Sequence, residues 1–363
     1  MDIGLVIYGD LDHPSGGFRY DRLLVEYLRD NGDTVEVISL PWRTYWRNVA
    51  SGFSRRLRDR LDRPFDVLLQ DELCHPTLWR TNRRLTRPKR TLALVHHVQS
   101  DVDDGRLAGI RRRIEREYLQ SVDGAIATSE FTKQRANRLA PAVDDWLVAP
   151  PAGRQEGSAL SEPTVRQRAS EGPLRVVSLG SLVERKNLLG LLSALDRLSS
   201  QYDCTNWRLS VLGSHDADPE YTQTVRERID ASGFGDRVDL LGEVSDEVVT
   251  ETLESSHVLC VPSTYEGFGM VYLEAMEYGV VPIATTNGGA SEFVTDGETG
   301  ALVEPSDVDR IASLLAAWAA DRERLADLGV GALRSAAAHP TWDETFGSVR
   351  SFMTAQDSTT QHR

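Results

Sequence analysis

HVLCVPSTYEGFGMVYLE, residues 257–274, is the stretch of this 363-residue chain that decides the fold. It opens with an apolar run that ends at a proline, which predicts a buried strand over residues 257–261. A glycine-rich turn follows, and residues 271–278 have the pattern of a helix. A buried strand that passes through a tight turn into a helix is the repeating unit of parallel α/β sheets. We therefore expect an α/β protein.

Two carboxylates, Glu266 and Glu274, lie eight positions apart in this stretch, with Gly267 and Gly269 between them. Free N–H groups and the helix dipole attract anions to a helix N-terminus, and glycine lets a phosphate approach the backbone closely. Glu274 lies about two turns into the helix, on roughly the same face as Glu266. An ordinary strand–helix turn with two surface acids is the simpler interpretation. The alternative is a nucleotide-sugar site, with one acid for a sugar and one for a ribose diol.

This stretch resembles the signature of the family 4 retaining glycosyltransferases, which have the GT-B fold. The signature is Glu, seven residues, Glu, with Gly-Phe-Gly after the first acid, and Gly267, Phe268 and Gly269 complete it here. The resemblance covers nearly the whole chain, and its specific motifs are densest in residues 174–303. It implies two Rossmann-like, doubly wound α/β domains that face a central cleft.

Length and composition agree with a soluble two-domain protein. A chain of 363 residues is long enough for two domains, and its 40% hydrophobic and 26% charged content is ordinary. Cys74, Cys204 and Cys260 have no metal-type spacing, so we interpret them as reduced and structural. Residues 1–7 read as a first strand and not as a signal peptide, and no apolar run of about 18 residues appears. We expect a cytoplasmic protein.

The charge of the chain is strongly uneven. The net charge is −14, and Lys89, Lys133 and Lys186 are the only lysines. High internal salt and a GC-rich genome both explain this composition. Residues 41–140 nevertheless carry a net charge of +9, against −23 for the rest of the chain. A basic block inside an acidic protein indicates an anionic partner.

Strands and helices alternate from the start of the chain, as expected for two tandem doubly wound domains. A stretch rich in Pro, Gly, Ser and Glu interrupts the alternation after residue 149. We expect an acceptor-binding domain over 1–155, a linker over 156–173 and a donor domain over 174–338. The resemblance implies that a last helix over 341–353, within 339–363, crosses back onto the first domain. The expected strands are 4–8, 34–39, 67–69, 91–95, 124–128 and 146–148, then 174–180, 207–212, 238–242, 257–261, 281–284 and 301–303.

Two adjacent cations, Arg185 and Lys186, end a loop between an expected strand and a helix that begins near Asn187. Cations at a helix N-terminus are unfavourable unless an anion binds there, and a pair of them suits a diphosphate leaving group. In the family, the matching Arg and Lys hold the donor diphosphate. Many members also have Arg where this chain has Ser181, which gives Arg185 and Lys186 a larger share of the charge. A solvated Arg-Lys pair is the alternative.

Two further glycine pairs match loops of the family. Gly288 and Gly289 follow an expected strand, where the family has a donor-side turn. Gly16 and Gly17 lie between the first expected strand and a helix from about Arg19, where the family has its first-domain glycine loop. The Gly-x-Gly-x-x-Gly pattern of dinucleotide-binding proteins is absent there.

His96 and His97 follow the expected strand 91–95. The family has a histidine here that contacts the transferred sugar. The match favours His96, with His97 as the alternate, because neighbouring side chains of a strand point in opposite directions. Two polar residues that cap a strand are the simpler interpretation. Adjacent residues rarely ligate one metal ion, and residues 101–104, Asp-Val-Asp-Asp, read as a solvated loop, so we expect no metal site.

A basic, aromatic-rich segment occupies residues 42–61, and Arg111–Arg113 add to its charge. Basic amphipathic helices with tryptophan suit an anionic lipid surface. Solvated arginines over a packed apolar face are an equally simple interpretation. Nucleic acid is disfavoured, because the chain is acidic overall and contains no nucleic-acid motif.

The resemblance implies a retaining transferase that moves a hexose, such as mannose or glucose, from a nucleoside-diphosphate sugar to an acceptor glycan or lipid-linked sugar. Glu266 and His96 are the expected catalytic residues, Phe268 belongs to the donor loop, and Glu274 would hold the nucleotide ribose. No metal or other cofactor is expected, and the enzyme would lie peripherally on the inner membrane face. A nucleotide-sugar epimerase would turn over donor without acceptor. A non-catalytic sugar-nucleotide-binding subunit would be expected to have lost one of these motifs.

Overall fold

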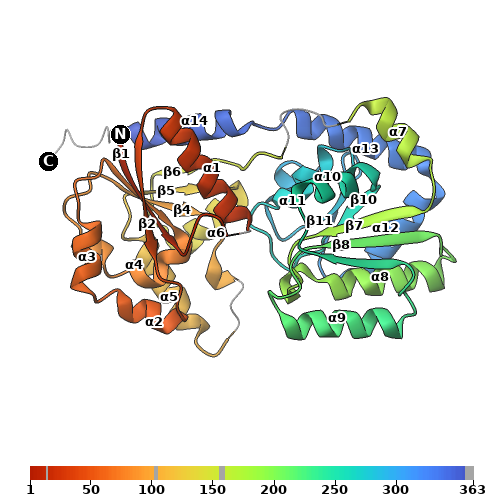
Figure 1. The fold of residues 1–363 in the computed structure, drawn as a ribbon, viewed down its shortest axis with the longest axis horizontal. Coiled ribbons are helices and arrows are strands. Elements are labelled where there is room, and N and C mark those ends of the chain that lie inside the picture. The colour runs from red at the N-terminus through yellow and green to blue at the C-terminus, as the bar shows by residue number, and fades with distance from the viewer. Residues whose placement is uncertain (14, 102–104, 155–159, 356–363) are drawn as a thin grey trace. The chain divides into compact units, whose positions relative to one another are not determined.

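The computed structural model describes residues 1–13, 15–101, 105–154 and 160–355. Two compact units appear in Figure 1. Unit 1 contains Met1–Pro151 and Pro340–Arg363, and unit 2 contains Ala152–His339. Each unit contains one parallel six-stranded sheet with its helices, so the prediction of two doubly wound α/β domains is confirmed.

The sheet of unit 1 has the strand order β2-β1-β3-β4-β5-β6, and every neighbouring pair is parallel. Its strands are β1 (Asp2–Tyr8), β2 (Thr34–Leu40), β3 (Val67–Asp71), β4 (Thr91–Val95), β5 (Gly124–Ala127) and β6 (Trp146–Val148). Alternate residues of β1 enter the two cores on opposite sides of the sheet: Ile3, Leu5 and Ile7 on one side, Val6 and Tyr8 on the other. Helices cover both faces, which is why β3 and β4 are buried throughout and β1 is buried after its first residue.

Unit 1 has seven α-helices among its described residues. They are α1 (Gly16–Asp30), α2 (Tyr45–Ser51), α3 (Arg55–Leu61), α4 (His75–Leu78), α5 (Ala108–Leu119), α6 (Glu130–Leu139) and α14 (Trp342–Thr354). The start of α1 differs from the expectation, since Gly16 and Gly17 form its first turn and not a loop. Ser15 explains the difference, because its side chain caps the helix by accepting from the N–H of Phe18.

Helix α14 follows unit 2 in the sequence but packs in unit 1. Thr341 and Glu344 begin the helix with a capping box. Thr345 donates to the carbonyl of Pro150 at 2.8 Å, and Phe346 lies edge-on to Tyr20 at 5.2 Å between ring centroids. The helix thus completes the core on the α1 side of the sheet.

The sheet of unit 2 has the order β12-β11-β10-β7-β8-β9, again all parallel. Its strands are β7 (Leu174–Leu179), β8 (Trp207–Leu212), β9 (Val238–Gly242), β10 (Val258–Cys260), β11 (Val281–Thr285) and β12 (Ala301–Val303). Its helices include α8 (Leu188–Gln201), α9 (Pro219–Ala231), α10 (Asp246–Ser255), α11 (Met270–Met276), α12 (Val308–Ala320) and α13 (Arg322–Ala337).

The expected linker over 156–173 was wrong in part, because it contains helix α7 (Glu162–Ala169). Val165 is buried against α13, and the buried Arg168 donates to the carbonyls of Tyr278 and Gly279. The guanidinium has five N–H donors, so Arg168 can bond several carbonyls at once and tie α7 to the segment after α11. The polar composition concealed this helix, which belongs to unit 2.

Cys74, Cys204 and Cys260 are free thiols. Across the part of the chain that the structure describes, no helix combines the length and the apolar composition needed to cross a membrane.

Candidate functional site

The carboxyl end of β7 places two cations in unit 2. Gly180 follows the strand with φ of +130°, and a Cβ there would lie 2.9 Å from Cε of Lys186. Glycine is therefore needed for Lys186 to fold back against the strand end. Arg185 and Lys186 end a short 3-10 turn, and Asn187 then caps α8 with its side chain. The expected loop, cations and helix start are all at this edge of the sheet, where open α/β sheets bind ligands.

Glu266 lies between the two cations. Its Oε2 atom is 2.9 Å from Nζ of Lys186 and 3.2 Å from Nη1 of Arg185, and it accepts from the hydroxyl of Ser263 at 3.0 Å. Burial alone would raise the pKa of Glu266, but Lys186 and Arg185 together lower it to about 2. The carboxylate is therefore ionised, and the cluster of two cations and one anion keeps an excess positive charge that suits a diphosphate.

The turn at Gly288 and Gly289 holds the backbone of Glu266. The N–H of Gly289 donates to the carbonyl of Glu266 at 3.2 Å, and the N–H of Glu266 donates to the carbonyl of Asn287 at 3.1 Å. A Cβ on Gly288 would lie 2.5 Å from the Glu266 carbonyl oxygen. The predicted donor-side turn thus positions Glu266, and the N–H of Gly289 is already used within the protein.

The loop between Glu266 and α11 is fixed by Phe268 and Gly269. The side chain of Phe268 is buried and stacks on Phe293 at 4.8 Å between ring centroids, so it anchors the loop. Gly269 has φ of +94°, and a Cβ there would lie 2.5 Å from Cδ2 of Tyr272. The loop therefore requires glycine at 269. Gly267 lies between these fixed points.

Glu274 has a partner that the sequence did not reveal. Its carboxylate is almost fully buried in α11 and lies 3.0 Å from Nε of Arg154, whose guanidinium also pairs with Asp246. The backbone N–H of Arg154 donates to Glu277, one turn further along, at 2.9 Å. Glu266 and Glu274, which share one sequence motif, therefore have different cationic partners. Arg154 lies in an expected polar linker, where nothing in the local pattern distinguishes it.

In unit 1 the helix start at Gly16 and Gly17 packs directly on His96. A Cβ on Gly17 would lie 3.2 Å from Cδ2 of the His96 ring, tighter than side chains normally tolerate. Helix α1 can approach the end of β4 this closely because position 17 has no side chain. Two motifs that the sequence places 79 positions apart, at 17 and 96, thus lie in contact.

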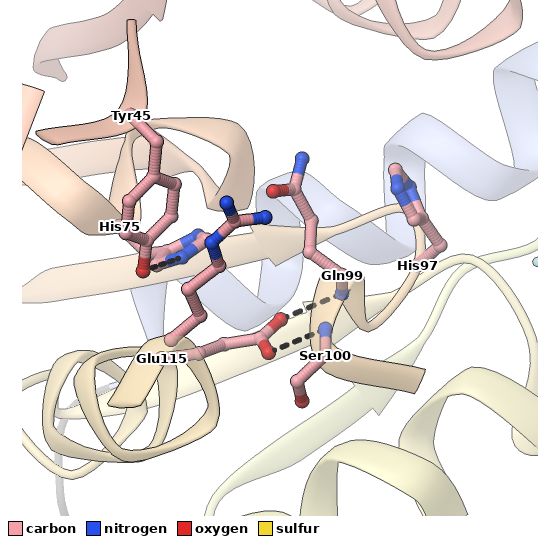
Figure 2. A pocket seen from close by; sticks show the side chains of 7 residues that line it. Tyr45, His75, His97, Gln99, Ser100 and Glu115 are labelled. Atoms are coloured by element: carbon pink, nitrogen blue, oxygen red, sulfur yellow. Dashed lines mark hydrogen bonds between the residues drawn. The ribbon is translucent and has the colours of Figure 1, made fainter. Parts of the chain in front are cut away.

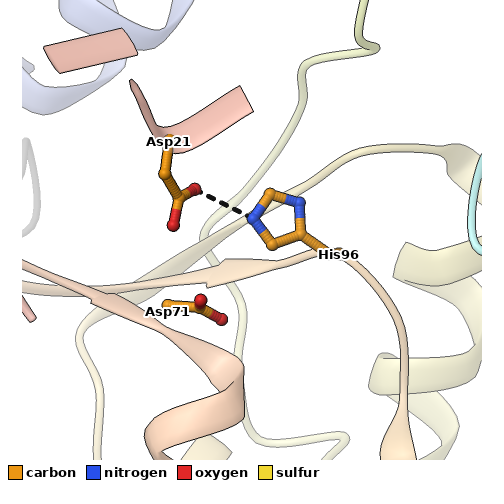
Figure 3. Close-up of side chains that lie close together, drawn as sticks. All are labelled: Asp21, Asp71 and His96. Carbon is orange, nitrogen blue, oxygen red and sulfur yellow. Dashed lines mark hydrogen bonds and ion pairs between the residues drawn. The ribbon is translucent and has the colours of Figure 1, made fainter. Parts of the chain in front are cut away.

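His96 belongs to a buried cluster with Asp21 and Asp71, drawn in Figure 3. The Nε2 atom of His96 lies 2.9 Å from Oδ1 of Asp21. Burial alone would lower the pKa of His96, but Asp21 raises it above its ordinary value. Burial and then Asp21 raise the pKa of Asp71 to about 7. Asp71 is therefore partly protonated near neutral pH, next to the hydrogen-bonded pair of His96 and Asp21.

The same three residues bring together the kinds of atom that ligate a cation. Asp21, Asp71 and His96 offer ligand atoms that all lie within 4.8 Å of one another, and the buried Oδ2 atom of Asp21 accepts no hydrogen bond from the described residues. Two carboxylates and an imidazole are a donor set that divalent metals accept. The expectation that the protein works without a metal therefore needs a direct test, since a proton and a metal ion compete for these atoms.

His97 faces a neighbouring cavity of about 320 Å³. Figure 2 shows its lining, in which the buried Glu115 accepts from the N–H groups of Gln99 at 2.7 Å and Ser100 at 2.9 Å. His97 also pairs with the buried Glu72, at 3.3 Å. The side chain of His97 is 34% exposed against 11% for His96, so the alternate histidine is the more accessible of the two.

Sequence reasoning missed Asp21, Asp71, Glu72 and Glu115. The sequence did contain a signal for Asp71 and Glu72, because polar residues at the end of a parallel strand often belong to a binding site. The expected strand 67–69 continues to Asp71, and its carboxyl end lies beside the carboxyl end of β4. Of the expected solvated loop 101–104, Asp101 ends a short 3-10 turn near Arg135, and 102–104 lie outside the described residues.

Comparison with known proteins gives one matching family and several relatives. The family described as glycosyl transferases group 1 matches residues 162–333. A GDP-mannose-dependent alpha-(1-6)-phosphatidylinositol monomannoside mannosyltransferase of Mycobacterium tuberculosis is 28% identical over 287 residues, covering 76% of this chain and 72% of the relative. A phosphatidyl-myo-inositol mannosyltransferase of Mycolicibacterium smegmatis is 28% identical over 340 residues, covering 87% and 84%.

Solved structures share the fold at low sequence identity. Sucrose-phosphate synthase of Thermosynechococcus elongatus has a TM-score of 0.79 at 20% identity and covers 96% of this chain and 97% of its own. HepE of Anabaena, in complex with UDP and glucose, has a TM-score of 0.76 at 17% identity and covers 98% and 100%.

Proposed function

Because the chain is a glycosyltransferase of group 1 with the GT-B fold, we propose that it transfers a mannosyl group from GDP-mannose to an acceptor hydroxyl with retention of the anomeric configuration. The observation that carries the proposal is the cluster of Arg185, Lys186 and Glu266 at the carboxyl edge of the unit 2 sheet. Relatives that are named GDP-mannose-dependent support the choice of donor. The family supports retention.

In the proposed reaction the bond between the anomeric carbon and the diphosphate oxygen breaks, and the acceptor oxygen bonds to that carbon from the same face. The acceptor proton passes to an oxygen of the leaving phosphate. Arg185 and Lys186 stabilise the negative charge that develops on the diphosphate. Glu266, ionised at neutral pH, contacts the donor sugar and holds the Lys186 ammonium group in place.

We assign the nucleotide ribose to Glu274, because a carboxylate can accept from both hydroxyls of a diol. Arg154 holds this carboxylate in the protein without ligand, and its second partner, Asp246, can retain the guanidinium when the ribose binds. In unit 1 we assign a sugar contact to His96, with Asp21 orienting its ring.

The proposal includes no metal, because Arg185 and Lys186 provide the positive charge that a divalent cation provides in other sugar-nucleotide sites.

We further propose that the enzyme works peripherally on the cytoplasmic face of a membrane, on a lipid-linked or glycan acceptor. Trp42, Phe53 and Trp46 are 59%, 55% and 39% exposed on the segment that carries the basic block. Exposed aromatic rings beside arginines are typical of surfaces that enter a lipid interface. Relatives named for phosphatidylinositol mannosides support a lipid acceptor.

A donor panel tests the proposed function. Purified protein is incubated with GDP-mannose, GDP-glucose, UDP-glucose and UDP-galactose, and thermal stabilisation and sugar transfer to a phosphatidylinositol mannoside are measured. We expect GDP-mannose to give the largest stabilisation and the only efficient transfer. A UDP-sugar that outperforms GDP-mannose would replace the donor assignment. Donor consumption without acceptor, yielding an epimer, would identify an epimerase.

A further inference from the structure

Unit 1 has a groove of about 740 Å³ between the ends of β1 and β2 and the helices α2 and α3. Arg43, Arg47, Arg56 and Arg60 line it, together with serine, threonine, asparagine and apolar side chains. No aspartate or glutamate is among its lining residues. The lining of this groove differs from that of the His97 cavity, and the proposed function leaves the groove without a role.

The four arginines are unusual in this chain, which has 55 acidic and 41 basic residues. Other arginines of unit 1 sit against carboxylates, as Arg63 does with Glu36 and Arg58 does with Asp59. Among the described residues, none of the four groove arginines forms an ion pair with a carboxylate. Their charge is therefore not compensated within the described part of unit 1, and an anion would compensate it.

The local structure makes the arginines converge. Arg56 and Arg60 are four positions apart on α3 and so share one helix face. Arg43 precedes α2, and Arg47 lies within it. Nη1 of Arg43 donates a hydrogen bond to Oγ of Ser51 at 3.5 Å, which ties Arg43 to the end of α2. Arg60 Nη1 donates to the carbonyl of Ser39 at 3.0 Å, at the end of β2.

The groove also has apolar lining residues. Leu40 and Tyr8, the last residues of β2 and β1, are among them, and the Tyr8 hydroxyl is hydrogen-bonded to Thr77 at 2.6 Å. Trp42 lies edge-on to Tyr8 at 5.6 Å and stacks on His13 at 6.0 Å, next to the start of α1. Trp42 thus connects the groove residue Tyr8 with the segment just before α1. The groove suits an anionic group joined to a ring or an apolar body.

We propose that this groove binds a phosphate ester of the acceptor, an inference that rests on the proposed transferase function. Arginine is the residue best suited to a phosphate, because its planar fork can donate two hydrogen bonds to two oxygens. The phosphate fixes the acceptor in unit 1, with its sugar directed toward the start of α1. A soluble sugar phosphate and the headgroup of a phospholipid offer the same chemistry.

The test measures binding in the absence of any nucleotide sugar, so it does not depend on turnover. Inositol 1-phosphate, free inositol, and vesicles of phosphatidylcholine with or without phosphatidylinositol are titrated into three proteins. These are the unmodified chain, the groove variant Arg47→Gln with Arg56→Gln, and the matched control Arg58→Gln with Arg63→Gln. The control removes two arginines of the same unit that already have carboxylate partners.

We expect inositol 1-phosphate to bind, free inositol not to bind, and the groove variant to lose at least tenfold in affinity while the control does not change. Binding only to phosphatidylinositol vesicles, lost in the groove variant, supports the site with a membrane-held ester as ligand. Equal binding by the groove and control variants, or no binding of either phosphate, overturns the inference. Failure of the proposed function is recognised separately, as absence of sugar transfer by the unmodified chain.

Discussion

Glu266 compensates the charge of Arg185 and Lys186 while no donor is bound. A carboxylate with a pKa of about 2 remains ionised in any ordinary assay and holds both cations at one edge of the unit 2 sheet. A diphosphate carries more negative charge than one carboxylate and can compete for the same N–H groups. We therefore expect the bound diphosphate to share Arg185 and Lys186 with Glu266, which stays beside Lys186 while it contacts the sugar.

Replacement of either partner in this cluster should therefore lower turnover. We expect Glu266→Gln and Lys186→Ala each to reduce kcat by on the order of 10²–10³, the usual cost of one lost charge-stabilising contact. Glu227→Gln is the matched control, because Glu227 is exposed on α9, where it accepts from Gln223. Steady-state kinetics and circular dichroism of the purified variants measure both effects. Near-normal turnover in either cluster variant would refute the assignment of the donor site.

The raised pKa of Asp71 predicts an unusual pH dependence of the stability of unit 1. Its pKa is about 7 in the folded protein against an ordinary value of 3.8, so unfolding between these values releases a proton. The free energy of unfolding should therefore fall as the pH rises from about 4 to 7 and level off above. Asp71→Asn should remove this contribution, which urea unfolding at several pH values measures. Buried His75, whose pKa is lowered to about 4, is present in both proteins and cancels. Equal pH slopes would contradict the prediction.

At the scale of elements, the strands could be predicted from the sequence, but the distant partners of buried polar side chains could not. Runs of apolar or β-favouring residues predicted β4, β6, β8, β9 and β12 with the observed bounds, and the central strand β4 is buried along its whole length. Helix α7 was missed, because its anchor is Arg168, whose carbonyl partners lie 85 to 111 positions away in the sequence. Arg154 and Glu274 likewise meet only in the folded unit. The local pattern records burial of a strand but not the identity of a distant polar partner.

The turn before α11 gives a prediction at this scale. Gly269→Ala should destabilise the turn and displace Glu266, because a Cβ at φ of +94° would lie 2.5 Å from the Tyr272 ring. Gly297→Ala is the control, since Gly297 also has positive φ, +76°, but a Cβ there meets no atom within 4 Å. We expect Gly269→Ala to lower kcat/KM at least tenfold and Gly297→Ala to cost about 1 kcal/mol of stability without loss of activity. Equal effects of the two would show that backbone strain alone matters.

For the whole molecule, the source of positive charge decides how the enzyme responds to chelation. We expect activity to survive EDTA, because Arg185 and Lys186 provide the charge at the diphosphate. Activity is measured before and after dialysis against EDTA, then with added Mn²⁺ or Mg²⁺. Loss on chelation with recovery on addition would show that the reaction needs a metal. Asp21→Asn would then test whether the buried cluster holds it.

The uneven charge of the molecule gives the last prediction, binding to anionic vesicles. Each basic residue near an anionic surface contributes about 1 kcal/mol, and this contribution fades with salt. Trp42→Ala with Trp46→Ala should weaken co-sedimentation several-fold even at high salt, since insertion of rings is not screened. Tyr202→Ala, 45% exposed in unit 2, is the control. Absence of sedimentation with any vesicle at any salt would leave the basic block as an ordinary solvated surface.

The position of helix α14 at the end of the sequence affects how the protein folds while it is synthesised on the ribosome. The hydrogen bond from Thr345 to Pro150 joins residues 195 positions apart, so unit 2 is translated in full before unit 1 receives its last helix. At 5–20 residues per second, that interval lasts roughly 10–40 s. Tyr20 lacks the ring of Phe346 during this time, and the apolar face beneath α14 stays open to solvent or to a chaperone. Unit 1, whose synthesis begins first, therefore receives its last helix only after unit 2 has been synthesised.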